Sequence, residues 1–343
     1  RVNYDFRSEI SEIIKFNKEK ELLHIKNFET KQLNYLWNLE LPYDQKQIPD
    51  EQIVLALGYF DGVHRGHQEV IKRAKEIAEN KNLKLAVMSF NHHPSIVFQK
   101  MNPETMQYLS TINRKAEIFE NLGVDYFFVV SFTSAFASLR PQEFVDQYIC
   151  GLHASAVVAG FDYTYGPREI ADMKQLVHYA KDRFEVIEVA ELKNEVEKIS
   201  STHIREALTE GDMEKANAYL GYVYQIEGTV IHGDARGRLL GFPTANIQTE
   251  KHTRLPRNGV YIVSIRVNGT WHRGTASIGH NITFEAGRDK TVEVYILDFD
   301  KMIYGENVAV RWHHFIRSEI KFSGIEQLIA QLKSDEADTI AYF

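Results

Sequence analysis

Residues 58–67 read GYFDGVHRGH, and they separate two segments of different character. The run before them, IVLAL (53–57), is continuously apolar and typical of a buried strand, whereas residues 68–78 (QEVIKRAKEIA) carry apolar side chains at helical spacing. The quoted stretch is therefore predicted to be a strand-to-helix turn. Free backbone N–H groups and the positive end of a helix dipole can meet an anion such as phosphate at a turn of this kind.

Two histidines and three glycines make this turn a candidate phosphate site. His64 and His67 can donate hydrogen bonds to phosphate oxygens, while Gly58, Gly62 and Gly66 allow the backbone to approach closely. Reactions at phosphorus need such donors held around the phosphate, in line with the attacking atom. The pattern also fits a histidine that only caps the helix, beside glycines that only make a tight turn.

The composition limits the class of protein. A chain of 343 residues predicts two domains, and the 44% hydrophobic and 25% charged content indicates a globular protein. The net charge of −7 and the lack of a basic run argue against a nucleic-acid partner. No stretch reaches the ~18 apolar residues of a membrane span, and the single cysteine, Cys150, excludes an intrachain disulfide. We expect a cytoplasmic protein with neither nucleic-acid nor membrane partners, and its oligomeric state stays open.

Strand and helix patterns alternate from residue 53 to about 208. This alternation predicts an α/β domain with a parallel, doubly wound sheet. Apolar runs lie at 53–57, 83–90, 126–132, 154–159 and 184–189, and helical patterns lie at 66–78, 113–122, 141–150 and 172–180. Ligands of such sheets bind beyond the carboxyl ends of the strands, which is where His64 and His67 would lie.

The pattern changes after about residue 221 to short segments rich in β-branched residues. They lie at 222–231, 259–267, 271–278, 291–299 and 308–312, and a helical pattern follows at 325–332. The sequence VNGT at 267–270 indicates a hairpin, because Asn-Gly suits a type I′ turn. We expect a small antiparallel barrel with a terminal helix. The predicted domains are 23–208 and 222–343, joined by a short helical linker at 209–221.

A second candidate anion site reads ISSTHIR at 199–205. Ser200, Ser201 and Thr202 can cap the helix that follows, and Arg205 lies one turn into it. An ordinary capping cluster is the alternative interpretation.

The combination G-x-FDG-x-H-x-GH with a later ISST-x-x-R resembles the nucleotidylyltransferase superfamily. More closely, it resembles the bacterial bifunctional riboflavin kinase/FMN adenylyltransferase (FAD synthetase) family. GFDYTYG (160–166) and SFNHHPSIVF (89–98) are also similar to family segments, and the likeness runs from about 23 to 343. It implies a Rossmann-like N-terminal domain in which FMN attacks the α-phosphate of ATP, giving FAD and pyrophosphate.

The resemblance also implies roles for single residues. His64 and His67 would hold the triphosphate, and Ser201, Thr202 and Arg205 would bind the leaving pyrophosphate. Three further residues would lie near the nucleotide: Phe60, Asp61 and Asp162. Three aromatic residues could stack on the flavin ring or, alternatively, only pack in the core: Phe90, Phe98 and Tyr165. The family's Asp-Pro-His-Pro reads NHHP at 91–94, a departure on the flavin side.

Residues 232–247, HGDARGRLLGFPTANI, form another glycine-rich stretch. The glycines and arginines suit a loop over phosphates, and Thr244 and Asn246 supply oxygen ligands of the kind that Mg²⁺ accepts beside ATP. Alternatively, the stretch is a glycine-rich turn followed by an edge-strand proline.

This stretch resembles the riboflavin kinase signature G-x-x-x-GR-x-LG-x-PTAN. The likeness implies that Gly233, Arg236 and Gly237 bind phosphate and that Thr244 and Asn246 bind Mg²⁺ with ATP. It further implies that Arg317 contacts flavin and that Glu293 takes the proton of the riboflavin 5′-hydroxyl. From its spacing alone, Glu293 is an exposed strand residue that alternates with valines.

Two departures leave alternatives open in this half. Ser277 replaces the family's usual asparagine and Ile282 its usual proline. The leading interpretation is a bifunctional enzyme that uses riboflavin, FMN and ATP and makes FAD. The alternatives are a single-activity FMN adenylyltransferase with a degenerate, flavin-binding kinase module, a flavin-binding regulator, and an adenylyltransferase for another substrate.

Overall fold

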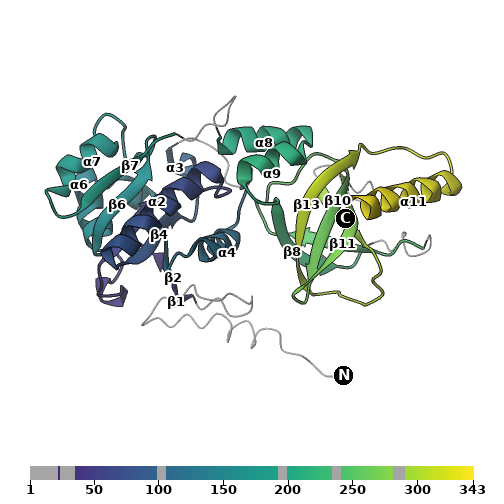
Figure 1. Ribbon diagram of the computed structural model, residues 1–343, viewed down its shortest axis with the longest axis horizontal. Helices are drawn as coiled ribbons and strands as arrows, with labels where there is room; N and C mark the ends of the chain where they lie inside the picture. Colours follow the sequence, from purple (N-terminus) through teal and green to yellow (C-terminus); the bar gives the residue numbers. More distant parts are fainter. Residues whose placement is uncertain (1–21, 24–34, 99–105, 192–198, 234–240, 281–289) are drawn as a thin grey trace, which may run out of the picture. The chain divides into compact units, whose positions relative to one another are not determined.

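The computed structural model describes residues 22–23, 35–98, 106–191, 199–233, 241–280 and 290–343 (Figure 1). Contacts within the chain divide it into two compact units. One unit comprises Arg1–Met106 with Ile112–Lys198, and the other comprises Gln107–Thr111 with Ile199–Phe343. The functional boundaries expected at 208 and 222 both fall inside the second unit, and they stay predictions.

A seven-stranded sheet forms the first unit, with the order β1-β2-β5-β4-β3-β6-β7. Every pairing is parallel except that of β1 with β2. The strands are β1 (Leu22–Leu23), β2 (Tyr35–Leu39), β3 (Ile53–Leu57), β4 (Lys84–Phe90), β5 (Tyr126–Val130), β6 (Ala154–Gly160) and β7 (Glu185–Val189). This topology confirms the predicted doubly wound α/β class. The strand β2 was not among the predicted elements.

The central strand β3 is covered on both faces, which explains its continuous apolar run. All five of its residues are buried. Leu55 and Leu57 share one core cluster with Phe144 and Tyr148, and β3 also packs against α2. The helical elements of this unit are η1 (Gln45–Gln47), α2 (Arg65–Lys81), α3 (Ser95–Phe98), α4 (Ile112–Leu122), α5 (Ser134–Ala137), α6 (Pro141–Phe144), η3 (Val145–Cys150) and α7 (Met173–Ala180).

The second unit contains a closed antiparallel barrel with the order β10-β11-β12-β9-β8-β13, in which β13 pairs with β10. This confirms the predicted barrel. Asn268 and Gly269 both have positive φ, at 46° and 81°, as a type I′ hairpin requires. The strands are β8 (Gln225–Ile231), β9 (Thr244–Thr249), β10 (Gly259–Val267), β11 (Thr270–His280), β12 (Lys290–Ile296) and β13 (Asn307–Arg317).

Three helices accompany the barrel: α8 (Ser201–Glu210), α9 (Met213–Leu220) and α11 (Ile325–Tyr342). Gly211 and Gly221 end α8 and α9 in the left-handed conformation, so the expected linker is helical. The terminal helix α11 lies against β10 and β11 and is longer than the predicted 325–332 (Figure 1).

Candidate active sites

The turn between β3 and α2 is compact and conformationally unusual. Phe60, Gly62 and Val63 all have positive φ, at 54°, 78° and 38°. Phe60 and Asp61 are nearly buried, and a Cβ atom on Gly58 would lie 2.7 Å from the Phe60 ring. Two non-glycine residues in the left-handed region cost energy, and they persist only where surrounding contacts fix the backbone. Strain of this kind is commonly found at functional sites.

The two histidines of the turn lie together at the start of α2. His64 is the N-cap residue of the helix, and its Nδ1 accepts a hydrogen bond from the backbone N–H of His67 at 3.4 Å. The two rings stack, with centroids 3.6 Å apart and planes 20° apart. His64 therefore does cap the helix, as the simpler interpretation predicted. Capping leaves phosphate binding possible, because a neutral ring that accepts at Nδ1 carries its proton on Nε2.

The surroundings of His67 favour its neutral form. Burial lowers the pKa of His67 well below its usual value, and the His64 ring and the Lys115 ammonium lower it further. Its Nδ1 atom is buried and has no hydrogen-bond partner among the residues that the structure describes. An unpaired polar atom of this kind costs free energy until a ligand or water satisfies it.

Lys115 is a residue of this site that the sequence analysis missed. It lies on α4 and is 1% exposed. Its Nζ donates to the backbone carbonyl of Tyr59, inside the turn, at 2.6 Å. The one signal in the sequence is its spacing, since Lys115 precedes the buried Phe119 by four residues and so shares its helix face.

The SST segment begins α8, as expected. Ser200 is the N-cap residue, and its Oγ accepts from the backbone N–H of His203 at 3.3 Å. Ser201 and Thr202 occupy the first turn, and Arg205 is half-buried one turn later. This start of a helix is suited to an anion. Because α8 belongs to the second unit, its joint action with the histidine turn stays a prediction.

The proposed flavin-stacking residues differ in their surroundings. The Phe90 ring is 6% exposed and packs edge-on against Phe132, with centroids 5.2 Å apart, so it is a core residue in this structure. Tyr165 is half-buried and stacks on Phe144 at 5.3 Å. The side chain of Phe98 lies outside the described residues. Asp162 is exposed just after β6. Contact of these residues with a ligand stays a prediction.

The barrel brings Thr244, Asn246 and Glu293 together. Glu293 on β12 pairs directly with Asn246 on β9, and its Oε2 lies 3.4 Å from the hydroxyl of Thr244. Residues two apart on a strand share a face, so all three side chains lie on one side of the β9–β12 ladder. Val292 and Val294 point to the opposite, buried side. Glu293 is half-buried, which corrects the exposed position that spacing alone predicted.

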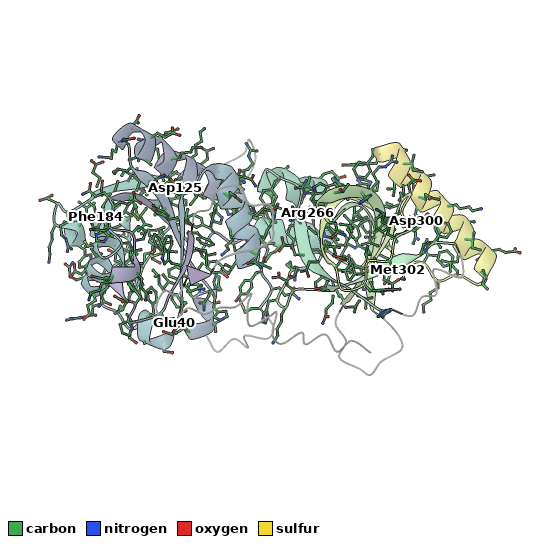
Figure 2. The ribbon with its side chains drawn as sticks, turned by 90° about the horizontal axis from the view of Figure 1, so that it is seen from below. Glu40, Asp125, Phe184, Arg266, Asp300 and Met302 are labelled. Carbon is green, nitrogen blue, oxygen red and sulfur yellow. The ribbon has the colours of Figure 1, made fainter. Side chains whose placement is uncertain are left out.

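Gly233 and a neighbouring pocket complete this face of the barrel. A Cβ atom on Gly233 would lie 2.1 Å from Nδ2 of Asn246, so any other residue there would displace the Asn246 amide. A pocket of about 260 Å³ is lined by Gly233, Thr244 and Asn246 on one side and by residues 299–304 on the other. Two of those residues, Asp300 and Met302, are labelled in Figure 2. Arg236 and Gly237 lie outside the described residues.

Arg317 makes a structural contact on the same unit. Its Nε and terminal nitrogen donate to the two carboxylate oxygens of Asp335 on α11, at 2.9 and 2.6 Å. The pair joins β13 to the terminal helix, and its contact with flavin stays a prediction. Ser277 is exposed and pairs with Glu293 across β11 and β12, while Ile282 lies outside the described residues.

Comparisons with known proteins show the family to which both parts of the chain are similar. A family model described as FAD synthetase matches residues 46–203, and one described as riboflavin kinase matches residues 220–343. A bifunctional riboflavin kinase/FMN adenylyltransferase from Listeria monocytogenes is 51% identical over 305 residues, covering 89% of this chain and 97% of that protein. The chain belongs to the bifunctional riboflavin kinase/FMN adenylyltransferase family.

Further relatives support the same family. The Bacillus subtilis protein of that name is 43% identical over 309 residues, covering 89% of this chain and 98% of that protein. The crystal structure of a protein described as a macrolide-efflux protein from Streptococcus pneumoniae has a TM-score of 0.80 at 38% identity, covering 88% of this chain and 98% of that one. Because both family models match, the bifunctional interpretation is supported over the single-activity alternative.

Two further features of the described residues concern metals and membranes. Among these residues no cluster of three or more histidine, cysteine, aspartate or glutamate side chains could hold a metal ion. A Mg²⁺ ion that arrives with ATP does not need such a cluster, because phosphates and waters fill most of its positions. In the same part of the chain, no helix is both long and apolar enough to cross a membrane.

Proposed function

We propose that this chain makes FAD in two steps, phosphorylating riboflavin on the barrel and adenylylating FMN at the histidine turn, with ATP in both steps. The observation that carries the proposal is the arrangement of Glu293 beside Thr244 and Asn246, in the same chain as the stacked His64 and His67. The partners are these small molecules, and the place of action is the cytoplasm.

In the kinase step, Glu293 accepts the proton of the riboflavin 5′-hydroxyl. The hydroxyl oxygen then bonds to the γ-phosphorus of ATP, while the bond from that phosphorus to the bridging oxygen breaks and ADP leaves. Thr244 and Asn246 hold the Mg²⁺ that accompanies ATP. This ion neutralises charge on the phosphates when it is bound. The pocket beside Gly233 receives the nucleotide.

In the adenylyl step, an oxygen of the FMN phosphate bonds to the α-phosphorus of ATP, and pyrophosphate leaves. The attacking phosphate is mostly a dianion at neutral pH, since its second pKa is about 6, so no side chain has to remove a proton. His64 and His67 donate to the triphosphate and stabilise the charge that develops. Ser201, Thr202 and Arg205 bind the departing pyrophosphate at the start of α8.

A chromatographic assay tests both steps. The purified protein receives Mg²⁺ and ATP with riboflavin in one tube and FMN in another. We expect FAD from both tubes. His67→Ala should still convert riboflavin to FMN but make no FAD, whereas Glu293→Gln should make FAD from FMN only. Riboflavin that stays unphosphorylated by the wild-type protein would contradict the kinase step, and FMN that stays unadenylylated would contradict the second step.

A further inference from the structure

Lys115 is a buried cation for which the proposed chemistry so far has no use. It is 1% exposed and is the fourth residue of α4. Burying an ammonium group is costly unless hydrogen bonds and nearby charges compensate it. Its surroundings therefore indicate what it stabilises.

The ammonium group of Lys115 is directed at a single point of the histidine turn. Nζ donates to the carbonyl oxygen of Tyr59 at 2.6 Å, and it lies 4.1 Å from the centre of the Tyr59 ring. The hydroxyl of Ser89, at the end of β4, donates to the same carbonyl at 2.7 Å and lies 3.4 Å from Nζ. The Tyr59 carbonyl thus receives one donor from α4 and another from β4. Burial lowers the pKa of Lys115 to about 8, and the nearby carboxylate of Asp61 opposes that shift and favours the charged form.

This contact reaches His67 through Phe60. Phe60 follows Tyr59 and has a φ of 54°. Its ring meets the ring of Phe119 on α4 edge-on, with centroids 5.8 Å apart, and the ring of His67 at 5.3 Å. Lys115 and Phe119 are one helical turn apart, so one face of α4 supports the backbone at Tyr59 and the ring at Phe60. A residue at positive φ keeps its conformation only under such contacts.

We propose that Lys115 is a positioning residue for FMN adenylylation, which holds the Tyr59 carbonyl and thereby sets the place of the His67 ring. The inference rests on the proposed phosphate-binding role of His64 and His67. Lys115 does not itself touch the substrate. The Lys115 ammonium also places a positive charge close to His67. Two other titratable groups lie here: His64 stacks on His67 and lowers its pKa, and the carboxylate of Asp61 favours the charged form of Lys115.

The test compares Lys115→Met with Lys115→Arg and with Lys72→Met, an exposed lysine on α2. For each full-length variant, the kcat/KM of FMN adenylylation and of riboflavin phosphorylation is measured in one preparation. We expect Lys115→Met to lower the adenylylation kcat/KM by about 100-fold, as a small displacement of a reactive group can do. Riboflavin phosphorylation should not change. Lys115→Arg should recover part of the loss, and Lys72→Met should behave as wild type.

A second readout separates positioning from a general loss of structure. The NMR signals of the His67 ring depend on where it lies against the rings of Phe60 and His64, so they should shift in Lys115→Met and shift less in Lys115→Arg. Ser89→Ala, which removes the other donor to Tyr59, should cause a smaller loss of adenylylation. It provides a test if Lys115→Met does not fold.

Several results would overturn the inference. One is wild-type adenylylation in Lys115→Met, and another is a loss of activity that leaves the NMR signals of the His67 ring unchanged. If Lys115→Met does not fold, wild-type adenylylation in Ser89→Ala would overturn the inference instead. His67→Ala shows which of the two proposed roles is wrong. If that variant keeps full adenylylation, the proposed role of the histidine turn is wrong; if it loses adenylylation while Lys115→Met does not, only the role of Lys115 is wrong.

Discussion

The carboxylate of Glu293 lies 3.4 Å from the hydroxyl of Thr244, across the pairing of β12 with β9. The two side chains therefore lie at one place, and the proposed kinase step uses them together, Glu293 as the acceptor of a proton and Thr244 as a ligand of Mg²⁺. Its contact with Thr244 also explains why the Glu293 side chain is half-buried, although alternation with the core valines predicts an exposed one. A carboxylate held here can accept a proton from a substrate hydroxyl that comes within hydrogen-bond distance of it.

Replacing the carboxylate tests its role as the base. We expect Glu293→Gln to lower the kcat of riboflavin phosphorylation by about 100- to 10,000-fold, because the amide cannot accept the proton. FMN adenylylation, measured in the same preparation, should be unchanged. Glu326→Gln, at an exposed position on α11, is the matched control. Kinase activity that survives Glu293→Gln would assign the base to another group.

A glycine beside the proposed metal ligand offers a second test. In Gly233→Ala the new Cβ would fall 2.1 Å from Nδ2 of Asn246, so the amide must move. We expect the apparent affinity for Mg²⁺ with ATP in the kinase reaction to fall by about 10- to 100-fold. Gly324→Ala places its Cβ in open space and is the control. Equal metal titrations of both variants and wild type would exclude Asn246 as a ligand.

The sequence predicted those parts of the fold in which local pattern and burial agree. The apolar run of β3 and the helical spacing of α2 located the histidine turn, and Asn268-Gly269 located a hairpin, because each signal lies within a few residues. The second unit shows the limit of local patterns. Thr244 and Asn246 were predicted as ligands, but no strand was predicted at their positions; they lie on the barrel strand β9, which pairs with β12 and β8.

Lys115 shows why part of the site could not be predicted. A lysine between Arg114 and Ala116 is typical of a helix surface. Its burial depends on the Tyr59 carbonyl, 56 residues away, and on the Ser89 hydroxyl. A backbone carbonyl has no sequence signature. Phe90 is the opposite case: its place in a family motif suggested contact with a ligand, but its ring packs in the core against Phe132 and Phe136.

The terminal helix should depend on one buried ion pair. Asp335 is 1% exposed and accepts both donors of Arg317. Asp335→Ala leaves the arginine uncompensated, which we expect to cost about 3–5 kcal/mol of stability. Heating the full chain and assaying each activity should show an earlier loss of riboflavin phosphorylation and an unchanged loss of adenylylation. Asp338→Ala, at an exposed position on the same helix, is the control. Equal heat sensitivity of the two variants would contradict this role.

Acid should weaken the barrel through His313. Burial, with the Arg311 cation nearby, lowers the pKa of His313 to about 4, and its Nε2 lies 2.9 Å from the hydroxyl of Ser264. An unfolded chain keeps a histidine pKa of about 6.5, so between these values the unfolded state binds the proton more readily. The stability contributed by the neutral ring is complete above about pH 6.5 and is lost as the pH falls towards about 4.

The measurement is the thermal midpoint of the barrel, followed through riboflavin kinase activity after heating at pH 7 and at pH 5. In the wild-type chain we expect the midpoint to be lower at pH 5. His313→Gln keeps a hydrogen-bonding side chain that does not titrate, so the difference between the two pH values should shrink. The adenylylation midpoint of the same samples reports acid effects that arise elsewhere in the chain. An undiminished difference in His313→Gln would show that another group carries the acid sensitivity of the barrel.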